Sequence, residues 1–157
     1  MDHYVGIGEL CVARAPSTIV TRGLGSCVGV VLHDINRSVG GLAHIMLPSS
    51  TDFTSYTNPH KFADLAIPAM HEQLLQLGGR NFKARIAGGA KMFATVSERA
   101  GFDVGVRNVE RVRQVLRQLG IAIVNEDVGG SVGRTVTFEV STGSVKVRSV
   151  GRGEQVL

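Results

Sequence analysis

The first half of the chain carries short apolar runs separated by turn residues, a pattern typical of strands. These runs lie within residues 4–13, 18–21, 28–33 and 39–47. Ala15-Pro16-Ser17 is a turn signal between the first two runs, and a polar stretch separates the last two. The pattern therefore predicts buried strands in this half, with the last two joined by a tight turn.

A helical pattern follows a polar loop rich in Ser and Thr at residues 49–57. Asn58 is expected to cap this helix, with the following proline at its first position. The helix should continue to about Leu77 and stop at Gly78, while Pro68 should kink it or divide it. The side chains expected to point inward are Phe62, Leu65, Ala66, Leu74 and Leu77.

A strand and a second helix are expected further along. Residues 82–87 are typical of a strand, and a helix should start near Asn108, its predicted cap, and end at Gly120. Its apolar face consists of Val109, Val112, Val115, Leu116 and Leu119. Basic residues at 107–117 alternate with that face, so we interpret them as a solvated helix surface rather than a track for phosphates.

The C-terminal part has the pattern of a hairpin. Apolar and polar residues alternate across 136–140 and again across 145–147. A two-residue loop at Thr142-Gly143 would place Val140 opposite Val145 and keep both apolar faces together. The whole pattern predicts an α+β fold with mostly antiparallel strands and with helices packed on one side.

Composition narrows the class of protein. The length of 157 residues fits one domain, and 43% hydrophobic with 19% charged residues fits a packed core rather than a disordered segment. Neither a long apolar run nor a signal peptide is present, so we expect a cytoplasmic protein without membrane insertion. The net charge of +4 favours acidic partners. Scattered basic residues and only 5% aromatics argue against nucleic-acid binding.

One cysteine and one histidine are expected to meet on the first predicted hairpin. If Ile35-Asn36 is a two-residue loop, Cys27 lies directly opposite His44 on the same sheet face, with Cβ atoms about 5 Å apart. Ile-Asn is not a favoured loop sequence, however, and a slip by one residue would put the two side chains on opposite faces. The prediction therefore depends on the turn.

A cysteine next to a histidine is typical of an activated nucleophile. A hydrogen-bonded imidazole lowers the pKa of a thiol and can give its proton to a leaving group. The glycine-rich approach to Cys27, with Gly25 and Ser26, could turn backbone N–H groups toward a developing oxyanion. Thr21 is the candidate to orient the imidazole. The candidate catalytic residues are therefore Cys27, His44 and Thr21, with Gly25 and Ser26 in the loop.

The remaining cysteine and histidines show no comparable pattern. Cys11 has neither a glycine loop nor an opposing histidine, and His33 lies beside the predicted turn. Two cysteines without a CxxC motif cannot form a structural zinc site alone. The short glycine pairs do not match nucleotide-binding fingerprints. No metal or organic cofactor is expected.

Six stretches, in this order and spacing, resemble the CheD family of chemoreceptor glutamine deamidases. They are GLGSCV at 23–28 with Thr21 before it, AHIMLP at 43–48, KFADLAIP at 61–68, GGAKMF at 88–93, VGVRNV at 104–109 and EDVGGSVGR at 126–134. The agreement extends from about Val5 to Val150, which is nearly the whole chain. This resemblance implies a single CheD-like deamidase domain over residues 1–157.

The resemblance also implies a fold, a site and partners. The fold would be a layered α/β/β sandwich similar to deamidating bacterial toxins, and the catalytic residues would be Cys27, His44 and Thr21. The substrate would be glutamine side chains on the cytoplasmic helices of methyl-accepting chemotaxis receptors, converted to glutamate through a Cys thiolate and a thioester. Some members also hydrolyse glutamyl methyl esters. The implied protein partner is CheC, a phosphatase of phosphorylated CheY.

Two other functions remain as alternatives at this point. A non-hydrolytic adaptor that binds CheC and modulates dephosphorylation of CheY-phosphate would keep that effect after Cys27→Ala. A nucleic-acid-binding module, suggested by the pI near 9.5, would bind with strong salt dependence.

Overall fold

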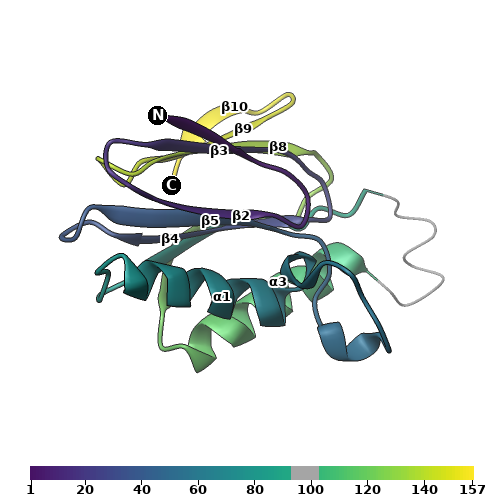
Figure 1. Ribbon diagram of the computed structural model, residues 1–157. Coiled ribbons are helices and arrows are strands. Elements are labelled where there is room, and N and C mark those ends of the chain that lie inside the picture. The colour runs from purple at the N-terminus through teal and green to yellow at the C-terminus, as the bar shows by residue number, and fades with distance from the viewer. Residues whose placement is uncertain (93–102) are drawn as a thin grey trace.

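The helices and strands form three layers (Figure 1). The computed structural model describes residues 1–92 and 103–157. Two five-stranded sheets lie face to face, and the two α-helices of the described residues cover the free face of one sheet. We call the sheet between the helices and the second sheet the central sheet, and the second the outer sheet. The expected α+β class, with helices on one side, is confirmed.

The outer sheet has the strand order β1-β3-β8-β9-β10. Its strands are β1 (Asp2–Val5), β3 (Thr18–Leu24), β8 (Arg134–Glu139), β9 (Val145–Ser149) and β10 (Gly153–Val156). Strands β1 and β3 are parallel, and the other neighbours are antiparallel. Burial alternates along β8 and β9, so their apolar residues face the central sheet as the alternating sequence predicted.

The central sheet has the strand order β2-β5-β4-β6-β7. Its strands are β2 (Leu10–Arg14), β5 (Val39–Ile45), β4 (Val28–Asp34), β6 (Lys83–Gly88) and β7 (Ala122–Val128). Strands β6 and β7 are parallel, and the other neighbours are antiparallel. Every residue of β4 and β5 is buried because both faces of this sheet are covered.

Side chains of β4 alternate between two cores. Val30 and Leu32 pack with residues of the helices, whereas Val31 packs with Phe138 and other residues of the outer sheet. The same alternation in β5 directs Leu42 to the outer sheet. This parity decides which side chains can reach the space between the sheets.

The helices are α1 (Ala63–Gln76) and α3 (Val104–Gln118), and two short 3₁₀ turns, η1 (Ser50–Asp52) and η2 (Pro59–Lys61), precede α1. Both α-helices stop where predicted, at Gly78 and Gly120, which have positive φ. Among the described residues, no helix combines the length and apolar character needed to cross a membrane.

Three helix predictions need correction. Asn58 caps η2 by accepting from the His60 N–H, and α1 begins only after Phe62. Of the two outcomes predicted for Pro68, a kink or a division, division is wrong, because α1 is one continuous helix. Asn108 is not a cap: α3 begins at Val104, where the Asp103 side chain accepts from the Val106 N–H. The sequence favoured Asn108 because its amide is a good cap, but that amide is buried inside the helix's packed face.

Both predicted hairpin registers are wrong by two residues. Asp34 pairs with Val39 rather than with Arg37, so the loop has four residues, and Ser38 adopts a φ of 56° within it. In the C-terminal hairpin, Val145 pairs with Phe138 rather than with Val140. Because side chains alternate with a period of two, an error of two residues leaves every side chain on its predicted face.

Candidate active site

Cys27 and His44 lie on one face of the central sheet, between the two sheets. Cys27 directly precedes β4 and packs in the core between the sheets. His44 lies on β5 opposite Gly29, so Cys27 and His44 are diagonal rather than direct neighbours. Side chains of diagonal neighbours are still within reach of an aromatic ring. The predicted shared face is therefore confirmed, whereas the predicted direct opposition is wrong.

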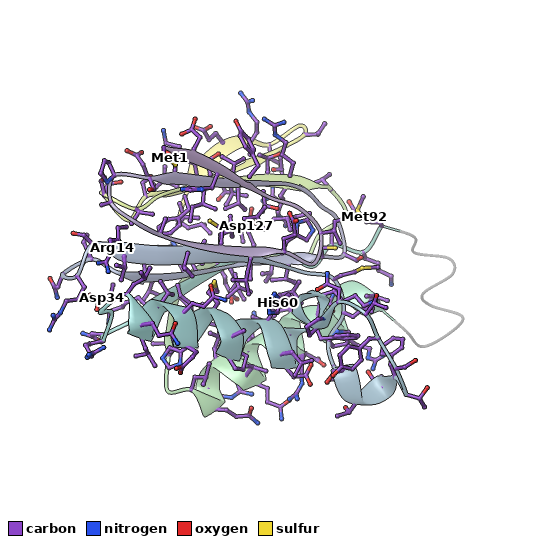
Figure 2. All side chains as sticks on the ribbon, in the orientation of Figure 1. Met1, Arg14, Asp34, His60, Met92 and Asp127 are labelled. Carbon is purple, nitrogen blue, oxygen red and sulfur yellow. The ribbon has the colours of Figure 1, made fainter. Side chains whose placement is uncertain are left out.

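This pair lies at the end of the sheets away from the β4–β5 loop. Figure 2 shows Asp34, the last residue of β4, and Met92 at opposite ends of the molecule. Met92 packs over the glycine loop before Cys27, since a Cβ on Gly25 would lie 3.1 Å from the Met92 Cγ. The nucleophile candidate therefore lies at the end marked by Met92.

Thr21, on β3 of the outer sheet, fixes the imidazole of His44. The Thr21 hydroxyl donates to the Val5 carbonyl at 2.6 Å, and its oxygen lies 2.7 Å from His44 Nδ1. Since the single hydroxyl hydrogen is used by Val5, the oxygen must accept from Nδ1–H. His44 is therefore held as the Nδ1–H tautomer, with the lone pair on Nε2.

The other ring nitrogen of His44 is available as a base. Nε2 is buried and has no hydrogen-bond partner within the described part of the chain, and Cys27 Sγ does not contact it as a hydrogen-bond donor. A buried acceptor without a partner is uncommon in folded proteins and often marks a functional position. Hydrogen bonds of catalytic groups often tighten only when substrate binds.

Burial keeps both members of the pair neutral. Burial raises the pKa of the Cys27 thiol, and a hydrogen bond from its own backbone N–H offsets only part of this rise. Burial also lowers the pKa of the His44 imidazole. The expectation that His44 lowers the thiol pKa in the resting protein is therefore not met, because the two groups are not hydrogen-bonded. The resting pair is a thiol and a neutral imidazole.

The loop before Cys27 is held by the end of β6. A Cβ on Gly88 would lie only 2.2 Å from the Cys27 carbonyl oxygen, so only glycine fits there. The Gly89 N–H donates to that oxygen at 2.9 Å, and the Ala90 N–H donates to the Gly25 carbonyl at 2.8 Å. Sequence reasoning placed 88–90 after the predicted strand and assigned these residues no role, although the double glycine was a signal of close backbone approach.

Among the N–H groups of the predicted oxyanion loop, that of Gly25 is bonded to a backbone carbonyl, and those of Ser26 and Cys27 are candidate donors to an oxyanion. The Gly25 N–H donates to the Gly23 carbonyl at 3.0 Å, within a turn in which Gly23 has a φ of 70°. Gly25 would have to release that carbonyl to bind an oxyanion. The N–H groups of Ser26 and Cys27 follow directly in the chain and are the candidate donors, although that of Cys27 bonds its own sulfur in the resting protein.

The other cysteine and histidines lie elsewhere. Cys11 is half-buried on β2, and burial raises its pKa. His33 is buried, donates from Nε2 to the Val140 carbonyl at 3.1 Å and packs edge-on against Phe138. It therefore has a structural role. In the part of the chain that the structure describes, no group of three or more His, Cys, Asp or Glu side chains could hold a metal ion.

The polar loop at 49–57 is anchored rather than free. The Ser50 N–H and hydroxyl donate to the two carboxylate oxygens of Asp64 at 2.9 and 2.7 Å. Phe53 and Tyr56 both pack on the Phe62 ring. Phe53 also borders a pocket that includes residues of α3, so this loop lies against the end of α3 that faces the site.

Comparison with known proteins places the chain in a family. A family model described as "CheD chemotactic sensory transduction" matches residues 46–149. A protein of Clostridium acetobutylicum named "Probable chemoreceptor glutamine deamidase CheD" is 47% identical over 151 residues, which cover 95% of this chain and 91% of that protein. Proteins of the same name from Clostridium novyi and Clostridium botulinum are 48% identical over 151 residues, covering 95% of this chain and 93% of each.

The matches to the Clostridium proteins include the candidate site, whereas the family model begins at residue 46, after it. The alignments with these relatives leave only about 5% of this chain unmatched, which is fewer residues than precede Thr21. Thr21, Cys27 and His44 therefore all lie within the matched stretch. The motifs on which the resemblance was based are therefore part of a similarity that extends over nearly the whole chain. The chain belongs to the CheD family.

Proposed function

We propose that this protein is a cysteine-dependent hydrolase that converts glutamine side chains of chemotaxis receptors to glutamate. Cys27 is the nucleophile, His44 the base and acid, and Thr21 the residue that orients His44. The observation that carries the proposal is the Nδ1–H tautomer of His44, which leaves an unpaired Nε2 on the face shared with Cys27. That arrangement suits transfer of a thiol proton to a neighbouring base.

The first half of the reaction forms a thioester. His44 Nε2 takes the Cys27 thiol proton as the sulfur attacks the carboxamide carbon, which gives a tetrahedral oxyanion. The imidazolium then gives its proton to the departing nitrogen, and the C–N bond breaks to release ammonia. The N–H groups of Ser26 and Cys27 are the proposed donors to the oxyanion.

The second half regenerates the enzyme. His44 Nε2 accepts a proton from water, and the resulting hydroxide attacks the thioester carbon. Collapse of the tetrahedral intermediate breaks the C–S bond, and the imidazolium returns its proton to the sulfur. The products are a glutamate side chain and the free thiol. Each step uses one base whose tautomer Thr21 fixes, so no second acid is needed.

The receptor substrate is supported by the relatives, three of which carry the name chemoreceptor glutamine deamidase. Binding of CheC and hydrolysis of glutamyl methyl esters remain predictions from the family resemblance. The likeness to deamidating toxins also stays a prediction.

Mass spectrometry of a receptor cytoplasmic fragment tests the proposal. Incubation with the wild-type protein should convert specific glutamines to glutamates, which sequencing of the peptides locates. Cys27→Ala should abolish the conversion, and Cys11→Ala, the matched control on the other cysteine, should leave it unchanged. Conversion by the Cys27→Ala variant at the wild-type rate would refute the assignment of the nucleophile.

A further inference from the structure

The β4–β5 ladder stops just short of the active site. Its last pair is Val28 with Ile45, and beyond it the two chains separate into the Cys27 loop and the segment that starts at Met46. The residue before the nucleophile, Ser26, and the residue after β5, Met46, therefore each have a carbonyl group that the ladder does not pair. If these two carbonyl groups had no partner, the Cys27 loop and the segment after β5 would be free to shift.

Asn108, on α3, fills this gap. Its side-chain Nδ2 donates one hydrogen to the Ser26 carbonyl at 2.9 Å and the other to the Met46 carbonyl at 3.0 Å. Asn108 is completely buried. Rotation of the amide by half a turn would place Oδ1 against two carbonyl oxygens, so this orientation is fixed by the acceptors.

Close packing brings α3 to this position. A Cβ on Gly105, in the first turn of α3, would lie 2.5 Å from the Ala90 carbonyl oxygen and 2.6 Å from that of Gly89. The helix can therefore approach the 89–90 backbone only because residue 105 is glycine. That same backbone segment binds the Cys27 loop, so α3 and the end of β6 enclose the loop together.

We infer that Asn108 is a positioning residue for the proposed reaction, because its amide ties the backbone next to Cys27 to the backbone that carries His44. Ser26 immediately precedes the nucleophile, and Met46 follows the base by two residues. The distance between the Cys27 sulfur and the His44 imidazole depends on how these two backbone segments are held. The Asn108 Oδ1 is buried and has no partner among the described residues. This agrees with a residue whose role depends on its two N–H donors and not on its carbonyl oxygen.

This inference rests on the proposed function, and Asn108→Ala tests it. The variant should lower kcat for receptor deamidation roughly 10- to 100-fold, because small displacements of reacting groups have effects of this size. KM should stay within about twofold, since Asn108 does not contact the substrate. A freed loop should also expose the thiol, so iodoacetamide should alkylate Cys27 about threefold faster or more. Peptide mass spectrometry separates Cys27 from Cys11.

Val112→Ala is the matched control. Val112 lies one helical turn further along α3 and is completely buried, so its truncation destabilises the fold without touching the loop. It should change neither kcat nor the alkylation rate of Cys27. Asn108→Ser, which keeps one donor, should give intermediate values.

Values for Asn108→Ala that match those of Val112→Ala would overturn the inference. Loss of the fold in both the alanine and the serine variant at position 108 would also contradict it, because the two hydrogen bonds are local. Activity that survives Cys27→Ala would overturn the proposed function instead. In that case the alkylation comparison still tests whether Asn108 holds the loop.

Discussion

Replacing Thr21 with valine isolates the hydrogen bonds that set the tautomer of His44. The substitution removes one hydroxyl group and nearly preserves the shape of the side chain. In the wild-type protein, this hydroxyl donates to the Val5 carbonyl at 2.6 Å and accepts from His44 Nδ1–H at 2.7 Å. The variant therefore leaves a buried carbonyl and a buried N–H without partners.

The size of the effect follows from these two bonds. Each contributes about 0.5–1.5 kcal/mol, so the free energy of unfolding should fall by about 1–3 kcal/mol. If the transition state loses the same amount, kcat falls about 5- to 160-fold, because about 1.4 kcal/mol corresponds to a factor of ten. Without Thr21, the imidazole proton can move to Nε2, and that nitrogen then no longer accepts the Cys27 proton.

Nuclear magnetic resonance of ¹⁵N-labelled histidine reports the tautomer directly, and ammonia release reports kcat. The wild-type protein should show Nδ1 protonated, and Thr21→Val should show a mixture or the other tautomer. Thr21→Ser keeps the hydroxyl and should retain both properties. Thr18→Val, on the same strand but on the opposite face by alternation, should change neither. A Thr21→Val variant with wild-type tautomer and kcat would refute the role given to Thr21.

Three further predictions follow from the same structure. First, kcat/KM should rise with pH through the pKa of His44, with a midpoint below the ordinary value of 6.5, because burial lowers that pKa and only the neutral imidazole is a base; a midpoint above 6.5 in the pH profile would contradict this. Second, Gly88→Ala should abolish deamidation and raise Cys27 alkylation, since a Cβ there overlaps the Cys27 carbonyl; wild-type kcat in this variant would contradict the close approach. Third, Asp34→Ala should lower the free energy of unfolding in urea by about 2–3 kcal/mol at neutral pH. Burial alone would raise the pKa of Asp34, but backbone N–H donors, among them those of Asn81 and Arg80, lower this pKa overall. The stabilisation by the Asp34 carboxylate is therefore present above pH about 4 and is lost as the pH falls further. A loss of unfolding free energy in Asp34→Ala that is equal at pH 3 and pH 7 would count against this role.

The shared face of Cys27 and His44 could be predicted from the sequence because it depends only on parity. Both hairpin registers differ from the expected ones by two residues, yet an even error preserves the face of each side chain. Register itself could not be predicted, because it depends on loop geometry, such as the positive φ of Ser38. The pattern of apolar and polar residues does not predict that backbone angle.

Contacts between distant segments were beyond sequence reasoning unless a family motif marked them. Thr21 reaches His44 from the other sheet, and no spacing rule connects two strands in different layers. Asn108 was interpreted as a helix cap because local propensity favours asparagine there, whereas tertiary packing places it inside α3 beside the Cys27 loop. In both cases the deciding partner is a backbone or side-chain group far away in the sequence.

Trapping of the acyl-enzyme tests the central claim most directly. Acid quenching during turnover of a receptor fragment, followed by mass spectrometry, should reveal the glutamyl group attached to the peptide that contains Cys27. Hydroxylamine should discharge that adduct and leave a hydroxamate at the receptor glutamine, as a thioester requires. Deamidation with no adduct on Cys27, or with the adduct on another residue, would contradict a mechanism in which His44 passes the Cys27 proton to the departing ammonia.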